Sequence, residues 1–245
     1  MNEQINPIEE DTKNPLQKFG DDLTARARTG KLDPVIGREN EIERIISTLS
    51  RRLKNNPVLV GEAGVGKSAV VEGLAQAIVR NDVPELLQGK IIFSLEMGSL
   101  MAGTKYRGSM EEKLKNAINE ITSRNDIIVF IDEIHMLMGA SNQGPMDLAN
   151  MFKEGLSRGT IKIIGATTTY EYEHFILRDK AFMRRFDKVD VAEPTEEMCV
   201  EILLKTLPKI EYQTNVKMPY TDFQKENIMR FIVGMTSEFK RVYEE

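Results

Sequence analysis

Residues 61–68 read Gly-Glu-Ala-Gly-Val-Gly-Lys-Ser, which is a complete G-x-x-x-x-G-K-S/T loop. Its three glycines let the backbone bend so that successive N–H groups point at phosphate oxygens. We expect Lys67 to reach the β- and γ-phosphates and the Ser68 hydroxyl to bind the accompanying Mg²⁺. The residues predicted to surround the phosphates are Gly61, Glu62, Ala63, Gly64, Val65, Gly66, Lys67 and Ser68. The loop therefore predicts binding of a nucleoside triphosphate.

The sequence on either side of the loop supports this interpretation. Residues 57–60 form a short apolar strand pattern, and residues 68–80 have the spacing of a helix. The phosphates would then meet the N-terminus of a helix, where free N–H groups and the helix dipole favour an anion.

The composition limits the class of protein. With 245 residues, 41% of them hydrophobic, the chain can form one large domain and part of a second. Its net charge of −5 argues against nucleic acid as a partner. The single cysteine, Cys199, excludes an internal disulfide, and a zinc site is not expected beside only two histidines. Without a membrane-length apolar run or a signal-peptide pattern at its start, we expect a cytoplasmic protein with no membrane partner.

Strand and helix patterns alternate through most of the chain. The apolar segments with the length of buried strands are 58–60, 91–95, 127–131, 161–165 and 188–191. Helical patterns separate them at 68–80, 109–124, 147–157 and 171–183. This alternation predicts an α/β fold, a five-stranded parallel sheet covered by helices on both faces, with its ligand at the carboxyl ends of the strands.

The pattern also predicts where the domains divide. After Glu193-Pro194 it becomes wholly helical, at 195–207 and 221–243. We therefore expect a linker or disordered lead-in at 1–16, a large nucleotide-binding domain at 17–193 and a helical small domain at 194–245. Two helices make a poor independent domain, so we expect this small domain to be partial. A short helix is also expected near 19–28.

A pair of carboxylates follows the strand at 127–131. Asp132 is placed to hold Mg²⁺, directly or through water, as the second half of a nucleotide-hydrolysing site. Glu133, one residue further, is placed to act as the general base toward the attacking water. This second acid favours hydrolysis over storage of the nucleotide.

Two further groups are candidates for the hydrolytic step. Thr168, with Thr167 as the alternate, follows the strand at 161–165 and could hold the attacking water or contact the γ-phosphate. Arg184 and Arg185 precede the last strand, where they cannot easily reach the γ-phosphate of their own chain. They could instead reach that of a neighbouring subunit and stabilise its charge in trans.

These motifs together resemble the AAA+ ATPases. The shared segments are residues 61–68, Phe130-Ile-Asp-Glu-Ile-His135, Gly165-Ala-Thr-Thr168 and Arg184-Arg-Phe186. More narrowly, the chain is similar to the first ATPase module of the Clp/Hsp100 unfoldases of the ClpB/ClpC group. The segments that carry this similarity are residues 22–38, Gly103-Thr-Lys-Tyr-Arg-Gly108 and Val191-Ala-Glu-Pro194. The resemblance runs from about residue 15 to residue 205 and implies ATP and Mg²⁺ as cofactors.

The resemblance implies roles that spacing alone does not. Val35 and Ile36 would pack against the adenine. Tyr106, with Lys105 and Arg107 on either side, would grip protein substrates in the pore of a homohexameric ring. The implied activity is hydrolysis of ATP to ADP and phosphate, which drives the threading of polypeptides, and we expect it to be weak in the isolated chain. Any peptidase partner would dock on a segment that this chain does not encode.

Two other functions remain open from the sequence. An ATP-gated scaffold or adaptor would assemble in the same way but thread nothing. A nucleic-acid motor or clamp loader shares the same core, although the one tight basic cluster, at 51–54, is most simply the solvated end of a helix.

Overall fold

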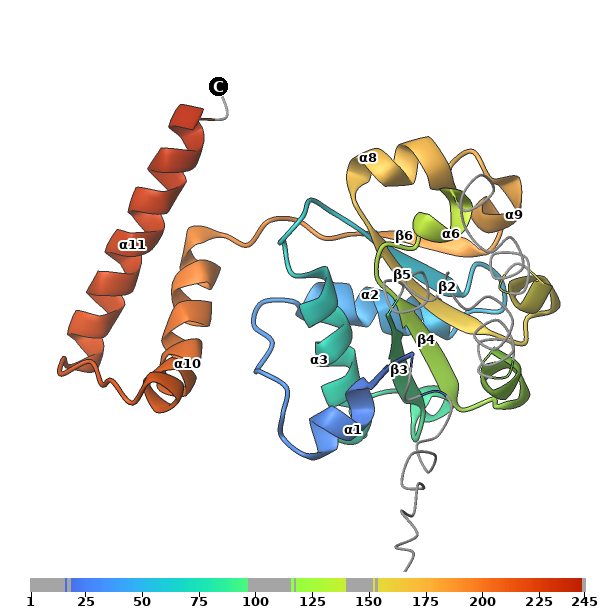
Figure 1. Ribbon diagram of the computed structural model, residues 1–245, viewed down its shortest axis with the longest axis horizontal. Helices are drawn as coiled ribbons and strands as arrows, with labels where there is room; N and C mark the ends of the chain where they lie inside the picture. Colours follow the sequence, from blue (N-terminus) through green and yellow to red (C-terminus); the bar gives the residue numbers. More distant parts are fainter. Residues whose placement is uncertain are drawn as a thin grey trace, which may run out of the picture.

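The computed structural model describes residue 16 and residues 19–96, 116, 118–139, 152 and 154–243. Figure 1 shows a large α/β domain and a separate pair of long helices, joined by one extended connection. The strands are β1 (Gly20–Asp22), β2 (Asn56–Val60), β3 (Ile91–Leu95), β4 (Ile127–Ile131), β5 (Lys162–Thr167) and β6 (Phe186–Asp190). The helices of the large domain are α1 (Leu23–Arg28), α2 (Glu39–Leu49), α3 (Lys67–Val79), η2 (Glu85–Leu87), α6 (Met136–Gly139), α8 (Thr169–Glu171), η4 (Tyr172–Ile176) and α9 (Lys180–Met183). The long pair is α10 (Glu196–Thr214) and α11 (Asp222–Tyr243).

The strands of the described residues form one six-stranded sheet in the order β1-β3-β4-β5-β2-β6. All neighbours are parallel except β1, which pairs antiparallel with β3 at the edge. The α/β class and the five parallel strands expected from the sequence are confirmed. The sequence did not predict the sixth strand, β1.

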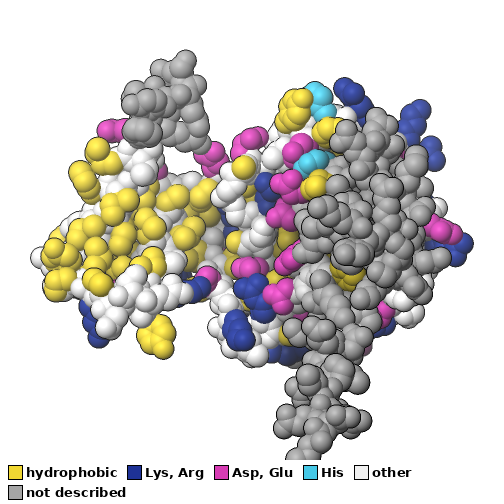
Figure 2. Space-filling view, viewed as in Figure 1, with side chains coloured by type: hydrophobic (Ala, Val, Ile, Leu, Met, Phe, Trp, Pro, Cys, Tyr) yellow, Lys and Arg dark blue, Asp and Glu magenta, His cyan; other side chains and the backbone are white. Residues whose placement is uncertain are grey.

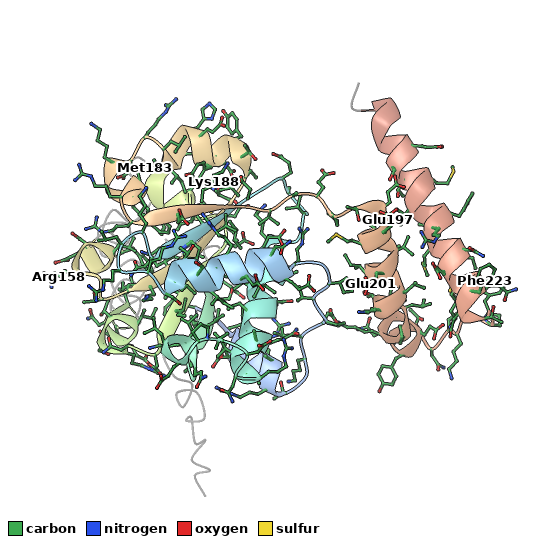
Figure 3. All side chains as sticks on the ribbon, turned by 180° about the vertical axis from the view of Figure 1, so that it is seen from behind. Arg158, Met183, Lys188, Glu197, Glu201 and Phe223 are labelled. Carbon is green, nitrogen blue, oxygen red and sulfur yellow. The ribbon has the colours of Figure 1, made fainter. Side chains whose placement is uncertain are left out.

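The α10–α11 pair has a small core of its own and a large apolar surface. Four buried side chains form the core, namely Val200, Leu207, Met229 and Val233. Figure 2 shows many hydrophobic side chains on one face of this pair, and Figure 3 shows Phe223 projecting from α11 on the side away from the large domain. The exposed apolar residues include Ile202, Ile210, Tyr212, Val216, Tyr220, Phe223, Phe231, Ile232 and Met235. No helix of the described residues is both long and apolar enough to cross a membrane.

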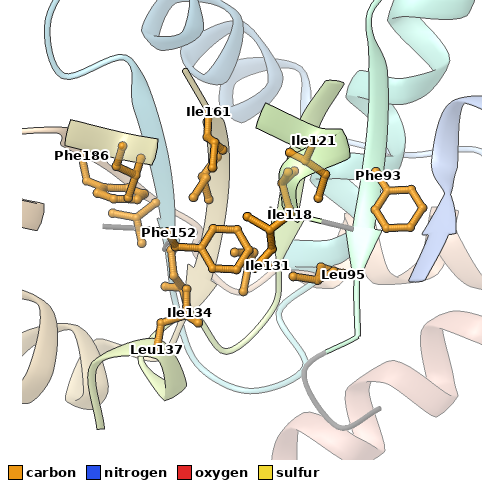
Figure 4. Packing of buried hydrophobic residues seen from close by; sticks show 14 of the residues in the cluster. Phe93, Leu95, Ile118, Ile121, Ile131, Ile134, Leu137, Phe152, Ile161 and Phe186 are labelled. Atoms are coloured by element: carbon orange, nitrogen blue, oxygen red, sulfur yellow. The ribbon is translucent and has the colours of Figure 1, made fainter. Parts of the chain in front are cut away.

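Side chains of the four central strands, β3, β4, β5 and β2, alternate between two hydrophobic clusters, one on either face of the sheet. In β4, for example, Ile128 and Phe130 pack with α3, whereas Val129 and Ile131 pack on the opposite face. Figure 4 shows this second cluster, in which Phe152 and Ile131 lie close together. Because both faces are buried, these central strands are largely apolar, which explains why they stand out in the sequence.

The helix expected near 19–28 is wrong in its first residues, which form β1 instead. A Cβ at Gly20 would lie 2.0 Å from the Ser94 carbonyl oxygen, so only glycine permits this close strand pairing. The Asp22 side chain then accepts a hydrogen bond from the Ala25 N–H at 2.8 Å and caps α1. Leu16, the last residue of the expected lead-in, is buried in the core; residues 1–15 lie outside the described part.

Two other helices also differ from expectation. The segment expected as one helix at 171–183 is divided into α8, the π-helical turn η4 and α9. The helix expected at 195–207 continues through Pro208 to Thr214. A proline inside a helix costs about 3 kcal/mol, and packing of Leu207 against α11 offsets this cost. Of the expected helices at 109–124 and 147–157, the structure describes the parts at 118–123 and 154–158, which are helical.

The Gly20 contact yields a stability test. We expect Gly20→Ala to lower the free energy of unfolding by roughly 1–3 kcal/mol, because the added methyl group must push β1 away from β3. Gly234→Ala is the matched control, since a Cβ there meets nothing within 4 Å and alanine favours a helix by about 0.8–1 kcal/mol over glycine. Denaturant unfolding measures both; equal effects of the two variants would contradict the close β1–β3 contact.

Candidate functional site

The phosphate loop lies between β2 and α3, as expected. Gly64 and Gly66 have φ values of 81° and 97°, in the left-handed region that glycine adopts readily. Gly66 is the N-cap of α3, which begins at Lys67. The first N–H groups of α3 therefore face the loop, where they can bind an anion. Glu62, Ala63 and Gly64 are exposed, whereas Gly61 and Val65 are buried beneath them.

Lys67, near the end of the phosphate loop, directs its ammonium group back toward the start of the loop. Its Nζ donates to the carbonyl oxygens of Gly61 at 2.7 Å and Glu62 at 2.9 Å. These two carbonyl oxygens keep the Lys67 ammonium group at the loop. The charged oxygens of a bound phosphate would be stronger hydrogen-bond acceptors for it.

The two predicted halves of the site are in contact. The Ser68 hydroxyl donates to Asp132 Oδ2 at 3.3 Å, although 64 residues separate them in the sequence. A hydroxyl and a carboxylate, both exposed to solvent, suit the oxygen ligands that Mg²⁺ prefers. The residues present therefore fit a bound Mg²⁺ ion.

Glu133 is held in an unusual backbone conformation. Its φ is 57°, in the left-handed region that non-glycine residues rarely adopt. The Glu133 N–H donates to Asp132 Oδ1 at 3.0 Å. The Asp132 carboxylate contacts the backbone of this turn, and 61% of the Glu133 side chain remains exposed. Strained residues of this kind are common at functional sites.

The two threonines after β5 differ in position. Thr167 is buried and pairs with Val60 at the base of the phosphate loop, where its carbonyl accepts from the Gly61 N–H at 3.3 Å. Thr168 is the N-cap of α8 and forms a capping box with Glu171. The Thr168 hydroxyl donates to Glu171 Oε2 at 2.8 Å. A contact of Thr168 with water or the γ-phosphate stays a prediction.

The structure separates the two arginines. Arg185 Nε donates to the Leu156 carbonyl oxygen at 2.8 Å, and Arg185 Nη2 lies 3.1 Å from the Ser157 hydroxyl oxygen. Arg184 is exposed, and among the described residues it has no hydrogen-bond or ion-pair partner. Only Arg184 is therefore free to reach a neighbouring molecule without losing contacts within its own chain.

The segment with the predicted adenine contacts lies between the domains. Val35 and Ile36 are half-buried, and Val35 packs beside Gly73 of α3. Across from this segment, Lys209 of α10 forms an ion pair with Asp33, with Nζ–Oδ distances of 2.7 and 2.8 Å. The α10 helix thus approaches the same segment that carries Val35 and Ile36.

Several residues near the site carried no predicted role. Arg38 is buried; it donates to the Val65 carbonyl and to Glu41 Oε1, and so ties α2 to the phosphate loop. No local signal in the sequence marks Arg38. His135 and Glu171 are in contact beside Thr167. Glu171 could have been found from the sequence, because it lies three residues after Thr168, the spacing of a helix capping box.

A cleft of about 670 Å³ lies beside the Ser68–Asp132 contact. Its lining includes Arg26, Glu72 and Glu133. Burial raises the pKa of the Glu72 carboxyl, against the lowering effect of the Arg26 charge. Figure 2 shows acidic side chains in a band on this face of the large domain, near the helical pair. The predicted pore-loop residues Lys105, Tyr106 and Arg107 lie outside the described residues.

Comparison with known proteins agrees with this geometry. Residues 57–193 match the family described as "ATPase family associated with various cellular activities (AAA)". The chaperone protein ClpB of Aquifex aeolicus is 53% identical over 212 residues, which are 86% of this chain and 21% of ClpB. ClpB of Mycobacterium tuberculosis is 52% identical over 215 residues, 86% of this chain and 25% of that protein. The chain thus spans a fifth to a quarter of the length of these relatives.

Solved structures of Hsp104 are similar as well. One, described as a closed state of Hsp104 with ATPγS and FITC casein, has a TM-score of 0.74 and 51% identity, and covers 82% of this chain and 35% of the other. The Saccharomyces cerevisiae Hsp104–ADP complex has a TM-score of 0.73 and 50% identity, and covers 82% and 34%. A phosphate loop, a carboxylate pair and a family match over more than half of the residues lead to one conclusion: the chain belongs to the AAA family of ATPases, as a module of the ClpB/Hsp104 type.

Proposed function

We propose that this module works in a homohexameric ring that uses ATP hydrolysis to thread protein substrates through a central pore. The observation that carries the proposal is the contact between Ser68 and Asp132, with Glu133 beside it. It joins a phosphate-binding loop to a metal-binding carboxylate and a candidate base, the parts that hydrolysis of ATP requires.

Each part has a defined role in the proposed reaction. The N–H groups of the loop and Lys67 bind the β- and γ-phosphates. Ser68 and Asp132 would hold Mg²⁺, which neutralises charge on the phosphate oxygens when it is bound. Glu133, whose side chain is exposed, accepts a proton from the attacking water. Thr168, at the end of the neighbouring strand, lies on the same edge of the sheet.

The adenine would lie between the domains, against Val35 and Ile36. Both residues are half-buried without being fully covered, so they retain apolar surface for a planar base. The Lys209–Asp33 ion pair and the packing of Met198 near Gly37 place α10 beside this segment. The nucleotide would thereby contact both domains.

A neighbouring subunit would complete the site with Arg184. A guanidinium group that acts in trans stabilises negative charge on the transferred phosphoryl group. Arg184 is exposed and free for such a contact, whereas Arg185 is bound to its own chain. This requirement for a second subunit is the physical reason for a ring.

Protein substrates are proposed from the relatives and from the residues Lys105, Tyr106 and Arg107. The descriptions of two Hsp104 structures include casein, a protein. An aromatic ring grips many kinds of side chain without sequence preference, which suits threading of unrelated polypeptides.

The different environments of the two arginines predict different defects. In the wild type, ATP turnover per subunit should rise with protein concentration as subunits meet. Arg184→Ala should abolish this rise, with a loss of roughly 10²-fold or more in the assembled state, because the trans charge is removed. Phosphate release measured over a concentration series tests this.

Arg185→Ala is the matched control. It should lower the thermal midpoint, since about 1–2 kcal/mol of hydrogen bonding is lost, yet keep the concentration-dependent turnover. The reverse pattern, with turnover lost in Arg185→Ala and kept in Arg184→Ala, would contradict the assignment.

Threading is tested at Tyr106. Tyr106→Ala should leave ATP turnover within about twofold of wild type but abolish unfolding of a fluorescent substrate protein, because the gripping ring is lost. Tyr106→Phe keeps the ring and should keep the unfolding. If Tyr106→Ala unfolds substrate as the wild type does, the ATP-gated scaffold becomes the better description.

A further inference from the structure

A partly buried histidine faces the carboxylate of Glu133. His135 Nε2 lies 3.7 Å from Glu133 Oε2, and only 14% of the His135 side chain is exposed. The proposed reaction gives His135 no role. A polar ring held at this distance from the candidate base can affect the reacting water directly.

The partners of the other ring nitrogen determine which one carries the proton. His135 Nδ1 lies 3.1 Å from Glu171 Oε2 and 3.1 Å from Thr167 Oγ1. The carboxylate can only accept, and the single Thr167 hydroxyl proton is donated to the same Glu171 oxygen at 3.1 Å. Nδ1 therefore carries the hydrogen, and Nε2 of the neutral ring is left as an acceptor.

Glu171 is suited to impose this tautomer. Burial raises the pKa of Glu171, but hydrogen bonds from the Thr168 N–H and hydroxyl, the nearby His135 ring and the Thr167 hydroxyl together lower it below its ordinary value. Glu171 is therefore an ionised acceptor. Phe175 stacks against the imidazole, with the ring centroids 5.9 Å apart, which further limits rotation of the ring.

A molecule that donates two protons can bridge two acceptors that face one another. His135 Nε2 and Glu133 Oε2 are close enough for one water oxygen to lie within hydrogen-bond distance of both. The ligand atoms of Glu133, His135 and Glu171 all lie within 4.8 Å of one another, as in a metal site. Because Glu171 Oε2 already accepts from Thr167 and Thr168, a water molecule fits this site better than a metal ion.

We propose that His135 is a second acceptor for the attacking water, which it aims together with Glu133. Both water protons are then engaged, so an oxygen lone pair is left for the γ-phosphorus. As the water oxygen bonds to phosphorus, the bond from phosphorus to the bridging oxygen breaks and ADP leaves with its electron pair. One water proton passes to Glu133, and the other stays on the new phosphate, hydrogen-bonded to Nε2. This inference rests on the proposed role of Glu133 as the base.

Two substitutions of His135 separate this role from a structural one. The amide of His135→Asn reaches the Nδ1 position and keeps the Glu171 contact, whereas the amide of His135→Gln reaches the Nε2 position and can accept from the water. Misplaced reacting groups cost about 10²-fold, so kcat should fall by that order in His135→Asn. We expect His135→Gln to recover most of this loss, with the dissociation constant for ATP unchanged in both variants.

Other outcomes of this comparison would overturn the inference. They are wild-type kcat in His135→Asn, an equal loss of kcat in both variants, or a loss that tracks weakened ATP binding. Glu133→Gln is the reference. If it retains wild-type turnover, the proposed base is wrong; if it loses turnover while His135→Asn does not, only the role of His135 is wrong.

The tautomer of His135 can be measured by NMR in the wild-type protein, without a substitution at His135. The chain has only two histidines, His135 and His174, so ¹⁵N shifts of histidine-labelled protein can be assigned with a His174→Gln variant. We expect the His135 shifts of a ring protonated at Nδ1 with a free Nε2. A ring protonated at Nε2 in the wild type would overturn the inference, even if the substituted proteins fail to fold.

Discussion

Parallel pairing of β2, β5 and β4 is the constraint on which the site depends. Val60 pairs with Thr167, and Ile131 pairs with Gly165, so the three strands end at the same edge of the sheet. The phosphate loop, the Asp132–Glu133 pair and Thr168 all follow directly from those ends. Had one strand run in the opposite direction, its polar residues would lie at the far edge of the sheet. The hydroxyl of Ser68 and the carboxylate of Asp132 meet because the strands below them are in register.

Much of this arrangement could be predicted because buried parallel strands are conspicuous in a sequence. The strands at 91–95 and 127–131 have the expected bounds, and the polar residues that follow β4 and β5 indicated the site edge. The strand β1 could not be predicted in this way. It depends on the close approach of Gly20 to Ser94, a tertiary contact without a local pattern.

The contacts of His135 could not be predicted from the sequence either, although the residue itself is part of the Phe130–His135 motif. They depend on three segments that meet only in the fold: the turn after β4, the end of β5 and the end of α8. Arg38 is a similar case, because its partner Val65 is 27 residues away and the contact is to a carbonyl oxygen. A hydrogen bond to a backbone carbonyl can form whatever side chain the partner residue carries, so no sequence pattern predicts it.

One helix connects the phosphate loop to the contact between the domains. α3 begins at Lys67, and near its other end the Gln76 amide donates to the Asp33 carbonyl oxygen at 2.7 Å. The carboxylate of the same Asp33 binds Lys209 of α10, with both side chains about half exposed. An exposed ion pair contributes only about 0–1 kcal/mol, so little free energy opposes its separation. A contact this weak is compatible with the proposed binding of the nucleotide by both domains.

We propose that a neighbouring subunit completes the site when ATP is bound. Light scattering of the Glu133→Gln protein at micromolar concentration, with ATP compared with ADP, tests it most directly, because this variant should bind ATP without hydrolysing it. We predict a species of ring size with ATP and a much smaller one with ADP. A monomer with both nucleotides, when ATP binding has been confirmed in the same sample, would contradict the claim.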